Sequence, residues 1–144
     1  SGDIQLVVRF YGTPAKVHEN FDFEHCKNYW CSWKKPASAL VLRKASLISI
    51  LSKELVYSGG SKYPLASLFR LRKFMQRGWY YTLGTMLKIV FDIQELDLAD
   101  ASVLEEQLIG MDIAYFREVI EVIKSDKPER IDAADLQQVI DELY

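Results

Sequence analysis

Two carboxylates lie two residues apart in FDFEHCKNYWCSW, residues 21–33. The alternation in this segment is imperfect but predicts a strand, in which Asp22 and Glu24 project from the same face. Neighbouring carboxylates can share a divalent cation such as Mg²⁺, as in two-metal phosphoryl or nucleotidyl transfer sites. Asp22 and Glu24 are therefore candidate catalytic residues, and Asp22 is a candidate metal ligand. The alternative is an acidic pair on the solvated face of a strand.

Histidine and cysteine are scarce, and the chain has only His18, His25, Cys26 and Cys31. Their spacing is not the tight Cys-x-x-Cys or His-x(3–5)-His pattern typical of zinc sites. In a strand the two cysteines would lie on opposite faces, so we expect no disulfide between them. We expect His25 to be a partly buried polar group and the cysteines to be small core residues in a reducing compartment.

A glycine-rich turn precedes a basic segment in SGGSKYPLASLFRLRKF, residues 58–74. Gly59 and Gly60 permit positive φ, and a helix starting at Pro64 offers free N–H groups to an anion. The residue order differs from the G-x-x-x-x-G-K-[ST] of a P-loop. We therefore expect a turn before a helix, with any anion contacts made by the helix itself.

Positive charge follows the helix expected over about 64–77. Three basic residues recur at i, i+3 and i+7, which places them on one stripe, and aromatic residues follow directly. Cations beside aromatic rings can pair with phosphates while the rings stack on bases. The alternative is a packed helix with a solvated cationic face. The candidate phosphate-binding or nucleic-acid-binding residues are Lys62, Arg70, Lys73, Arg77 and Trp79.

Charge is divided along the chain, although the net charge is only −2. Residues 1–88 hold 14 Lys or Arg and 5 Asp or Glu, and residues 89–144 hold 4 and 15, so +9 and −11 give the net −2. The first part could bind a polyanion, and the second would repel one. Alternatively, the two parts neutralise each other across an internal interface, or opposed faces bind a partner or assemble head to tail.

Size and composition predict one compact domain. The chain has 144 residues, of which 49% are hydrophobic, which is enough for a core. We find no secretory leader and no apolar run of the roughly 18 residues that cross a bilayer, so we expect a soluble cytoplasmic protein without a membrane partner. The start at Ser1 suggests a piece of a longer protein. An upstream domain, a second chain or a homo-oligomer remain open as partners.

The elements that must position these residues are strands first and helices afterwards. We expect strands over 4–11, 21–33 and 39–43, and helices over 14–21 and 45–55. Further helices are expected over about 64–77 and 82–96, then after a cap at Asp100 or Ser102, and over 114–125 and 132–144. This predicts an α+β fold in which a small sheet of N-terminal strands precedes a C-terminal helical bundle. The mixed part covers 1–57 and the helical part 58–144 of a single domain, 1–144.

Several of these motifs resemble viral and phage-encoded proteins related to the polymerase-β-like nucleotidyltransferases. The resemblance rests on IQLVVRFYG, FDFEHCKNYW, the Gly-Ser-x-Tyr-Pro turn and SLFRLRKFMQRGW. It implies that the first two are later strands of a palm sheet. The third catalytic carboxylate would then be Asp22, with Glu24 as a substitute, and the helical part would contact nucleotide or nucleic acid, in the host cytoplasm.

The main signature of that family, a Gly-Ser turn followed by a strand with Asp-x-Asp, is absent. After Ser61 no acidic residue occurs before Asp92, and a helix is expected there instead. The resemblance therefore implies a C-terminal portion that is incomplete or inactive alone, with its acids upstream or on a separate chain. We predict a nucleotidyltransferase-like domain that binds nucleotide or nucleic acid through its basic helix. The alternative is a protein-interaction or assembly domain with opposed basic and acidic faces.

Overall fold

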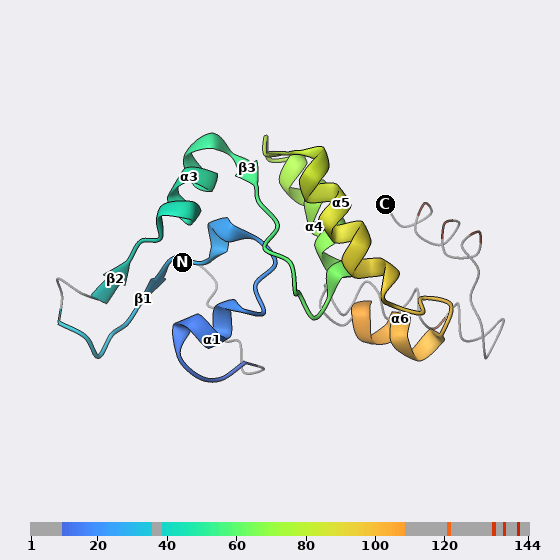
Figure 1. Cartoon of the computed structure of the whole chain (residues 1–144), viewed down its shortest axis with the longest axis horizontal. Coiled ribbons are helices and arrows are strands. Elements are labelled where there is room, and N and C mark those ends of the chain that lie inside the picture. The colour runs from blue at the N-terminus through green and yellow to red at the C-terminus, as the bar shows by residue number, and fades with distance from the viewer. Residues whose placement is uncertain are drawn as a thin grey trace.

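The computed structural model describes residues 10–35 and 39–108, together with Glu121, Ala134, Gln137 and Asp141. The strand expected over 4–11 lies almost entirely outside these residues, as do most of the two helices expected beyond residue 113. Within the described residues the fold is α+β, as expected, with short paired strands and five α-helices (Figure 1).

The elements follow one another in a mixed part and then a helical part (Figure 1). Thr13 and Thr82 cap α1 and α5, because their side chains accept hydrogen bonds from the backbone N–H groups of Lys16 and Thr85. In order, the elements are α1 (Pro14–His18), the 3-10 helix η1 (Glu24–Cys26), β1 (Tyr29–Trp30), β2 (Leu40–Val41), α3 (Lys44–Ser52), β3 (Glu54–Leu55), α4 (Pro64–Met75), β4 (Tyr80–Tyr81), α5 (Leu83–Gln94) and α6 (Ala101–Leu108).

The strand predicted over 21–33 is wrong for most of its length. Only β1 is a strand there, paired antiparallel with β2, and Phe23 makes an isolated bridge to Tyr57. Between them the chain turns through η1, where the Lys27 ammonium group contacts the Glu24 carboxylate at 2.7 Å. This i,i+3 contact suits a 3-10 turn, whereas an extended strand would send the two side chains to opposite faces.

The hydrophobic core forms where α4 and α5 meet the chain around η1 and β3. Its buried members are Phe23, Leu55, Tyr57, Leu71 and Ile89. Met75 is 51% exposed, because α4 ends there and the chain turns away through Gly78 at a φ of 78°. Phe74, the residue before Met75, still packs against the core.

A parallel pairing of β3 with β4 joins the two parts and was not predicted. Glu54 pairs with Tyr80 and Leu55 with Tyr81, and the Tyr80 N–H donates to the Lys53 carbonyl at 3.0 Å. Lys53 ends α3 in the left-handed conformation, with a φ of 55°. This pairing places the chain after the basic helix beside the core.

No helix within residues 10–35 and 39–108 is long and apolar enough to cross a bilayer.

Candidate phosphate-binding site

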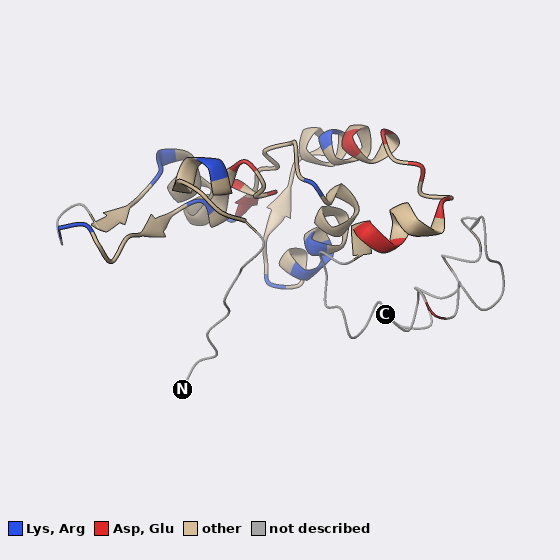
Figure 2. Ribbon diagram, turned by 90° about the horizontal axis from the view of Figure 1, so that it is seen from below, with Lys and Arg blue, Asp and Glu red and all other residues tan. Residues whose placement is uncertain are grey.

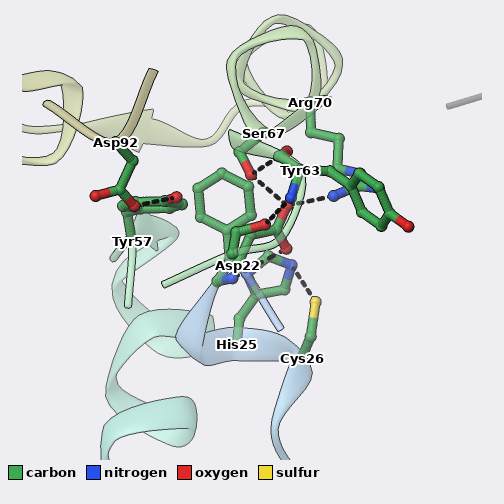
Figure 3. Close-up of polar contacts among 10 residues, drawn as sticks. Asp22, His25, Cys26, Tyr57, Tyr63, Ser67, Arg70 and Asp92 are labelled. Carbon is green, nitrogen blue, oxygen red and sulfur yellow. Dashed lines mark hydrogen bonds and ion pairs between the residues drawn. The ribbon is translucent and has the colours of Figure 1, made fainter. Parts of the chain in front are cut away.

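Asp22 lies at the centre of a polar cluster that ties the N-terminal part to α4 (Figure 3). One carboxylate oxygen accepts a hydrogen bond from the Phe23 N–H at 3.0 Å. The other accepts from the Ser67 hydroxyl at 3.1 Å and from Arg70 Nη1 at 2.5 Å. Asp22 is buried, so this is a charge-assisted contact in a desolvated setting. Both oxygens are thus occupied by the protein's own donors.

Glu24 is held by a different cation from the one that holds Asp22. Its Oε1 accepts from Lys27 Nζ at 2.7 Å and from the Ser58 hydroxyl at 2.7 Å. Burial opposes ionisation of Glu24, but the hydrogen bonds from Lys27 and Ser58 outweigh it and lower the pKa of the carboxyl. The two carboxylates therefore lie in separate ion pairs rather than side by side.

This arrangement does not suit a metal ion at Asp22 and Glu24. A divalent cation at Asp22 would compete with Arg70 for the same oxygen, and hard cations need several carboxylate or carbonyl oxygens together. Among the residues that the structure describes, no three His, Cys, Asp or Glu side chains gather as a metal site would require. The Mg²⁺ expected from the sequence stays a prediction.

The predicted cationic stripe divides into paired and open members. Arg70 faces Asp22, with about a third of its side chain exposed, whereas Lys73 lies exposed farther along the helix and Arg77 lies exposed in the turn after its end. The Lys53 ammonium group lies beside Gly78, immediately after Arg77. Since α4 contains no acidic residue, the C-terminal half of this helix presents an open cationic face (Figure 2).

Lys62 stands apart from this stripe. Its ammonium group contacts the Glu106 carboxylate of α6 at 3.1 Å, and both side chains are about half exposed. The hydrogen bond that Lys62 donates to Glu106 raises the pKa of Lys62, so the ammonium form is retained. Exposed pairs of this kind contribute little to stability, so Lys62 can exchange Glu106 for another anion.

Trp79 is not an open stacking platform. Its ring packs at 4.7 Å from the ring of His25 and at 5.6 Å from that of Phe74. The aromatic side chain that remains half exposed after the helix is Tyr80, whose hydroxyl donates to Glu54 at 3.2 Å. Any base stacking beside the cations would therefore involve Tyr80 more readily than Trp79.

The glycine turn donates a hydrogen bond to a carboxylate of the same chain, that of Asp92. Gly59 and Gly60 both adopt positive φ, 81° and 67°, and the Gly60 N–H donates to Asp92 at 3.2 Å. The same Asp92 oxygen accepts from the Tyr57 hydroxyl at 2.8 Å (Figure 3). Burial is the main cause that raises the pKa of Tyr57, and the hydrogen bond to Asp92 raises this pKa further. The turn thus fixes α5 against the start of α4 rather than binding a phosphate.

Sequence reasoning missed the partners of this cluster. Ser67 lies one turn before Arg70, and a serine in the apolar segment PLASLF was a usable signal for a buried hydrogen bond. Asp92 is the single acid between Glu54 and Glu95. Its isolation on an apolar helix indicated a specific partner, although the sequence could not name Tyr57 or Gly60.

His25 and Cys26 contact each other but do not form a reactive pair. His25 Nε2 lies 3.2 Å from the Cys26 sulfur, and the His25 ring packs between Phe74 and Trp79. Burial lowers the pKa of His25. Although residue Cys26 is exposed, desolvation of its sulfur and the nearby Asp22 raise the thiol pKa to about 11. Both groups are thus neutral near pH 7, which excludes a thiolate–imidazolium pair.

We expect Cys26 to alkylate slowly. At pH 8 a thiol with a pKa of about 11 holds roughly 100-fold less thiolate than one at the ordinary 9.0, so its reaction with iodoacetamide should slow in proportion. Peptide mass mapping over time distinguishes Cys26 from the buried Cys31. A rate for Cys26 equal to that of a cysteine in an unstructured peptide would contradict the environment described for the sulfur.

One comparison with known proteins returned a match. A model of the Gabija anti-defense 2 family matches residues 1–53 of the 144 residues. No curated protein and no solved structure matches the chain. The matched stretch contains Asp22 and runs to the end of α3, whereas α4 and its cations lie after it.

Proposed function

We propose that this chain is a phage anti-defense protein that acts in the host cytoplasm by binding the phosphates of a nucleotide or nucleic acid on α4. The observation that carries the proposal is the exposed pair Lys73 and Arg77, four residues apart, the first on the acid-free helix α4 and the second in the turn directly after it. Two exposed cations this close in the chain can each contact a phosphate. The match of residues 1–53 to the Gabija anti-defense 2 family supports the anti-defense role.

Arg70 extends this cationic face toward the buried cluster. Asp22 fixes the direction of its guanidinium group, and a guanidinium can donate hydrogen bonds to a phosphate as well as to a carboxylate. In this proposal Asp22 is a positioning residue for Arg70 rather than a catalytic one. Lys62, at the other end of α4, would add a contact once a phosphate replaced Glu106.

We also propose a relationship to the polymerase-β-like nucleotidyltransferases. The support is the set of sequence motifs together with a basic helix adjoining the segment that carries Asp22. The catalytic Asp-x-Asp acids would come from outside this chain. The chain alone would therefore bind nucleotide or nucleic acid without transferring a nucleotidyl group.

Removing the two open cations should weaken binding. Replacing Lys73→Gln and Arg77→Gln together is expected to lower the affinity for a fluorescently labelled single-stranded DNA by roughly tenfold or more at low salt, because two phosphate contacts are lost. Fluorescence anisotropy gives the affinity. The matched control is Lys16→Gln with Lys88→Gln, which removes the same charge from exposed lysines of α1 and α5.

Equal loss in both double variants would show that only net charge matters, and the site on α4 would be wrong. The biological role has a separate test. Bacteria that carry a Gabija defence system and express this chain should plate a susceptible phage more efficiently than bacteria with an empty vector. If the Lys73→Gln, Arg77→Gln variant still raises the plating efficiency of the phage, the anti-defense role does not depend on phosphate binding by these residues. Phosphate binding would then be wrong as the proposed mechanism.

A further inference from the structure

One end of the molecule exposes apolar side chains that we call the hairpin surface: Trp30, Leu40, Leu42, Ile48 and Leu51, each more than half exposed. Trp30 pairs directly with Leu40 across β1 and β2, so both side chains lie on one face of the hairpin. Leu42 follows two residues after Leu40 and continues that face. The hairpin projects from the body of the molecule (Figure 1).

The helix after the hairpin has its apolar side turned outward. α3 buries Ser46 and Ser49, and the Ser49 hydroxyl donates to the Glu54 carbonyl at 2.5 Å. Ile48 and Leu51, one turn apart, lie on the opposite side and are exposed. A helix that exposes its aliphatic side chains gains no free energy from burying them unless another surface covers them.

A second apolar surface lies on α5, which we call the α5 surface: Leu83, Met86, Leu87, Val90 and Phe91, with exposures between 37% and 71%. Their spacing of i, i+3, i+4, i+7 and i+8 forms one continuous stripe. The opposite side of the helix buries Thr85 and Ile89 in the core. α5 is therefore apolar on two sides, of which only one is covered.

The two surfaces carry opposite charge around them. Residues 29–35 and 39–53 hold five cations and no acid, a net charge of +5. Residues 83–108 hold one cation and six acids, a net charge of −5. Basic residues gather on the hairpin and α3, and acidic residues on the end of α5 and on α6 (Figure 2). Asp92 and Glu106 already contact Tyr57 and Lys62, but Glu95 is exposed four residues after Phe91 and places a negative charge beside the α5 surface.

From this complementarity we propose that the hairpin surface of one copy docks on the α5 surface of a second copy. Contact buries both apolar centres and sets cations such as Lys34 and Lys44 against acids such as Glu95. The hairpin and α5 belong to different parts of the elongated molecule (Figure 1), so each docked copy keeps one surface unused. Such a heterologous contact continues to grow as concentration rises. It does not depend on the phosphate site of α4.

Two single-surface variants test this pairing. Wild-type protein should show a mass in light scattering that rises with concentration, reaching a dimer and larger species at roughly 100 μM and above, as suits a modest interface. The hairpin variant Trp30→Ser with Leu40→Ser, and the α5 variant Leu87→Ser with Phe91→Ser, should each be monomeric alone. Mixed in equal amounts they should form a 1:1 dimer and nothing larger, because one intact surface of each remains.

Controls separate this result from unfolding and from other partners. All four substituted residues are exposed, so circular dichroism and the thermal midpoint should match those of wild type. Tyr11→Ser removes an exposed aromatic side chain outside both surfaces and should leave the mass unchanged. Association should weaken with salt, because the Debye length falls from about 10 Å at 0.1 M to about 3 Å at 1 M.

Three outcomes would overturn the pairing. A wild-type monomer at every concentration would mean that second copies do not cover these surfaces. Dimers of the hairpin variant alone would mean that α5 pairs with itself. Failure of the two folded variants to combine would mean that the surfaces do not recognise each other. If either serine variant misfolds, Lys34→Glu with Lys44→Glu, which keeps the apolar residues, should lower self-association, and unchanged association would again overturn the pairing.

Discussion

Asp22→Ala is expected to lower the free energy of unfolding by about 2–3 kcal/mol. The substitution removes the acceptor for the Phe23 N–H, the Ser67 hydroxyl and Arg70, and leaves these donors at a buried position. The loss should be smaller than for a fully buried ion pair, because about a third of the Arg70 side chain contacts solvent. Urea unfolding followed by circular dichroism measures it.

A double-mutant cycle assigns this loss to the Asp22–Arg70 contact. In an Arg70→Ala background, Asp22→Ala should cost less by about 1 kcal/mol or more, because the two residues share one interaction. Glu19→Ala is the matched control, since it breaks the exposed Lys16–Glu19 pair and should change stability by no more than about 0.5 kcal/mol. Additive losses at Asp22 and Arg70 would show that the carboxylate does not stabilise the fold through this ion pair.

Phe23→Ala should have the largest effect on stability, about 3–5 kcal/mol. Phe23 is fully buried, and its ring contacts those of Tyr57 and Phe74 at 5.9 and 6.0 Å. Truncation leaves a cavity in the core between the N-terminal part and α4. Because Asp22 is the preceding residue, the cavity should also loosen the ion pair with Arg70. Urea unfolding and differential scanning calorimetry give the change.

The control for this prediction is the same substitution at an exposed site. Phe91→Ala, on the α5 surface, should change the stability of dilute protein by about 0.5 kcal/mol or less, because this ring is 60% exposed. Similar losses at Phe23 and Phe91 would mean that the core is not centred on Phe23. A loss at Phe91 that appears only in concentrated protein would instead reflect association through the α5 surface.

The parts of the fold that the sequence predicted are those governed by local chemistry. Pro64 at the start of α4, Gly78 after its end and Thr82 before α5 each act on the neighbouring backbone alone, and these helices lie within two residues of their expected bounds. The cationic stripe followed from helical spacing in the same way. Lys73 is exposed on α4, whereas Arg77 is exposed in the turn after the helix ends at Met75, so the stripe is not continuous on one helix.

The parts that the sequence did not predict depend on contacts between distant residues. Asp22 and Glu24 were expected to share a face. Instead, Asp22 contacts Arg70, 48 residues away, and Glu24 contacts Ser58, 34 residues away. Hydrophobic periodicity indicates local structure and cannot identify partners this distant in the sequence. The same holds for the parallel pairing of Glu54 with Tyr80. The helix α3 itself was predicted correctly. The sequence did not show, however, that the serines of this helix face inward.

The salt dependence of nucleic-acid binding tests the central claim most directly. The logarithm of the binding constant for single-stranded DNA falls linearly with the logarithm of the salt concentration, with a slope of about 0.7 per phosphate contact. If Lys73 and Arg77 each contact a phosphate, the Lys73→Gln, Arg77→Gln variant should show a slope shallower than wild type by about 1.4, whereas the Lys16→Gln, Lys88→Gln control should keep the wild-type slope. Equal slopes for wild type and the α4 variant, or no measurable binding by wild type at low salt, would contradict a phosphate-binding site on α4.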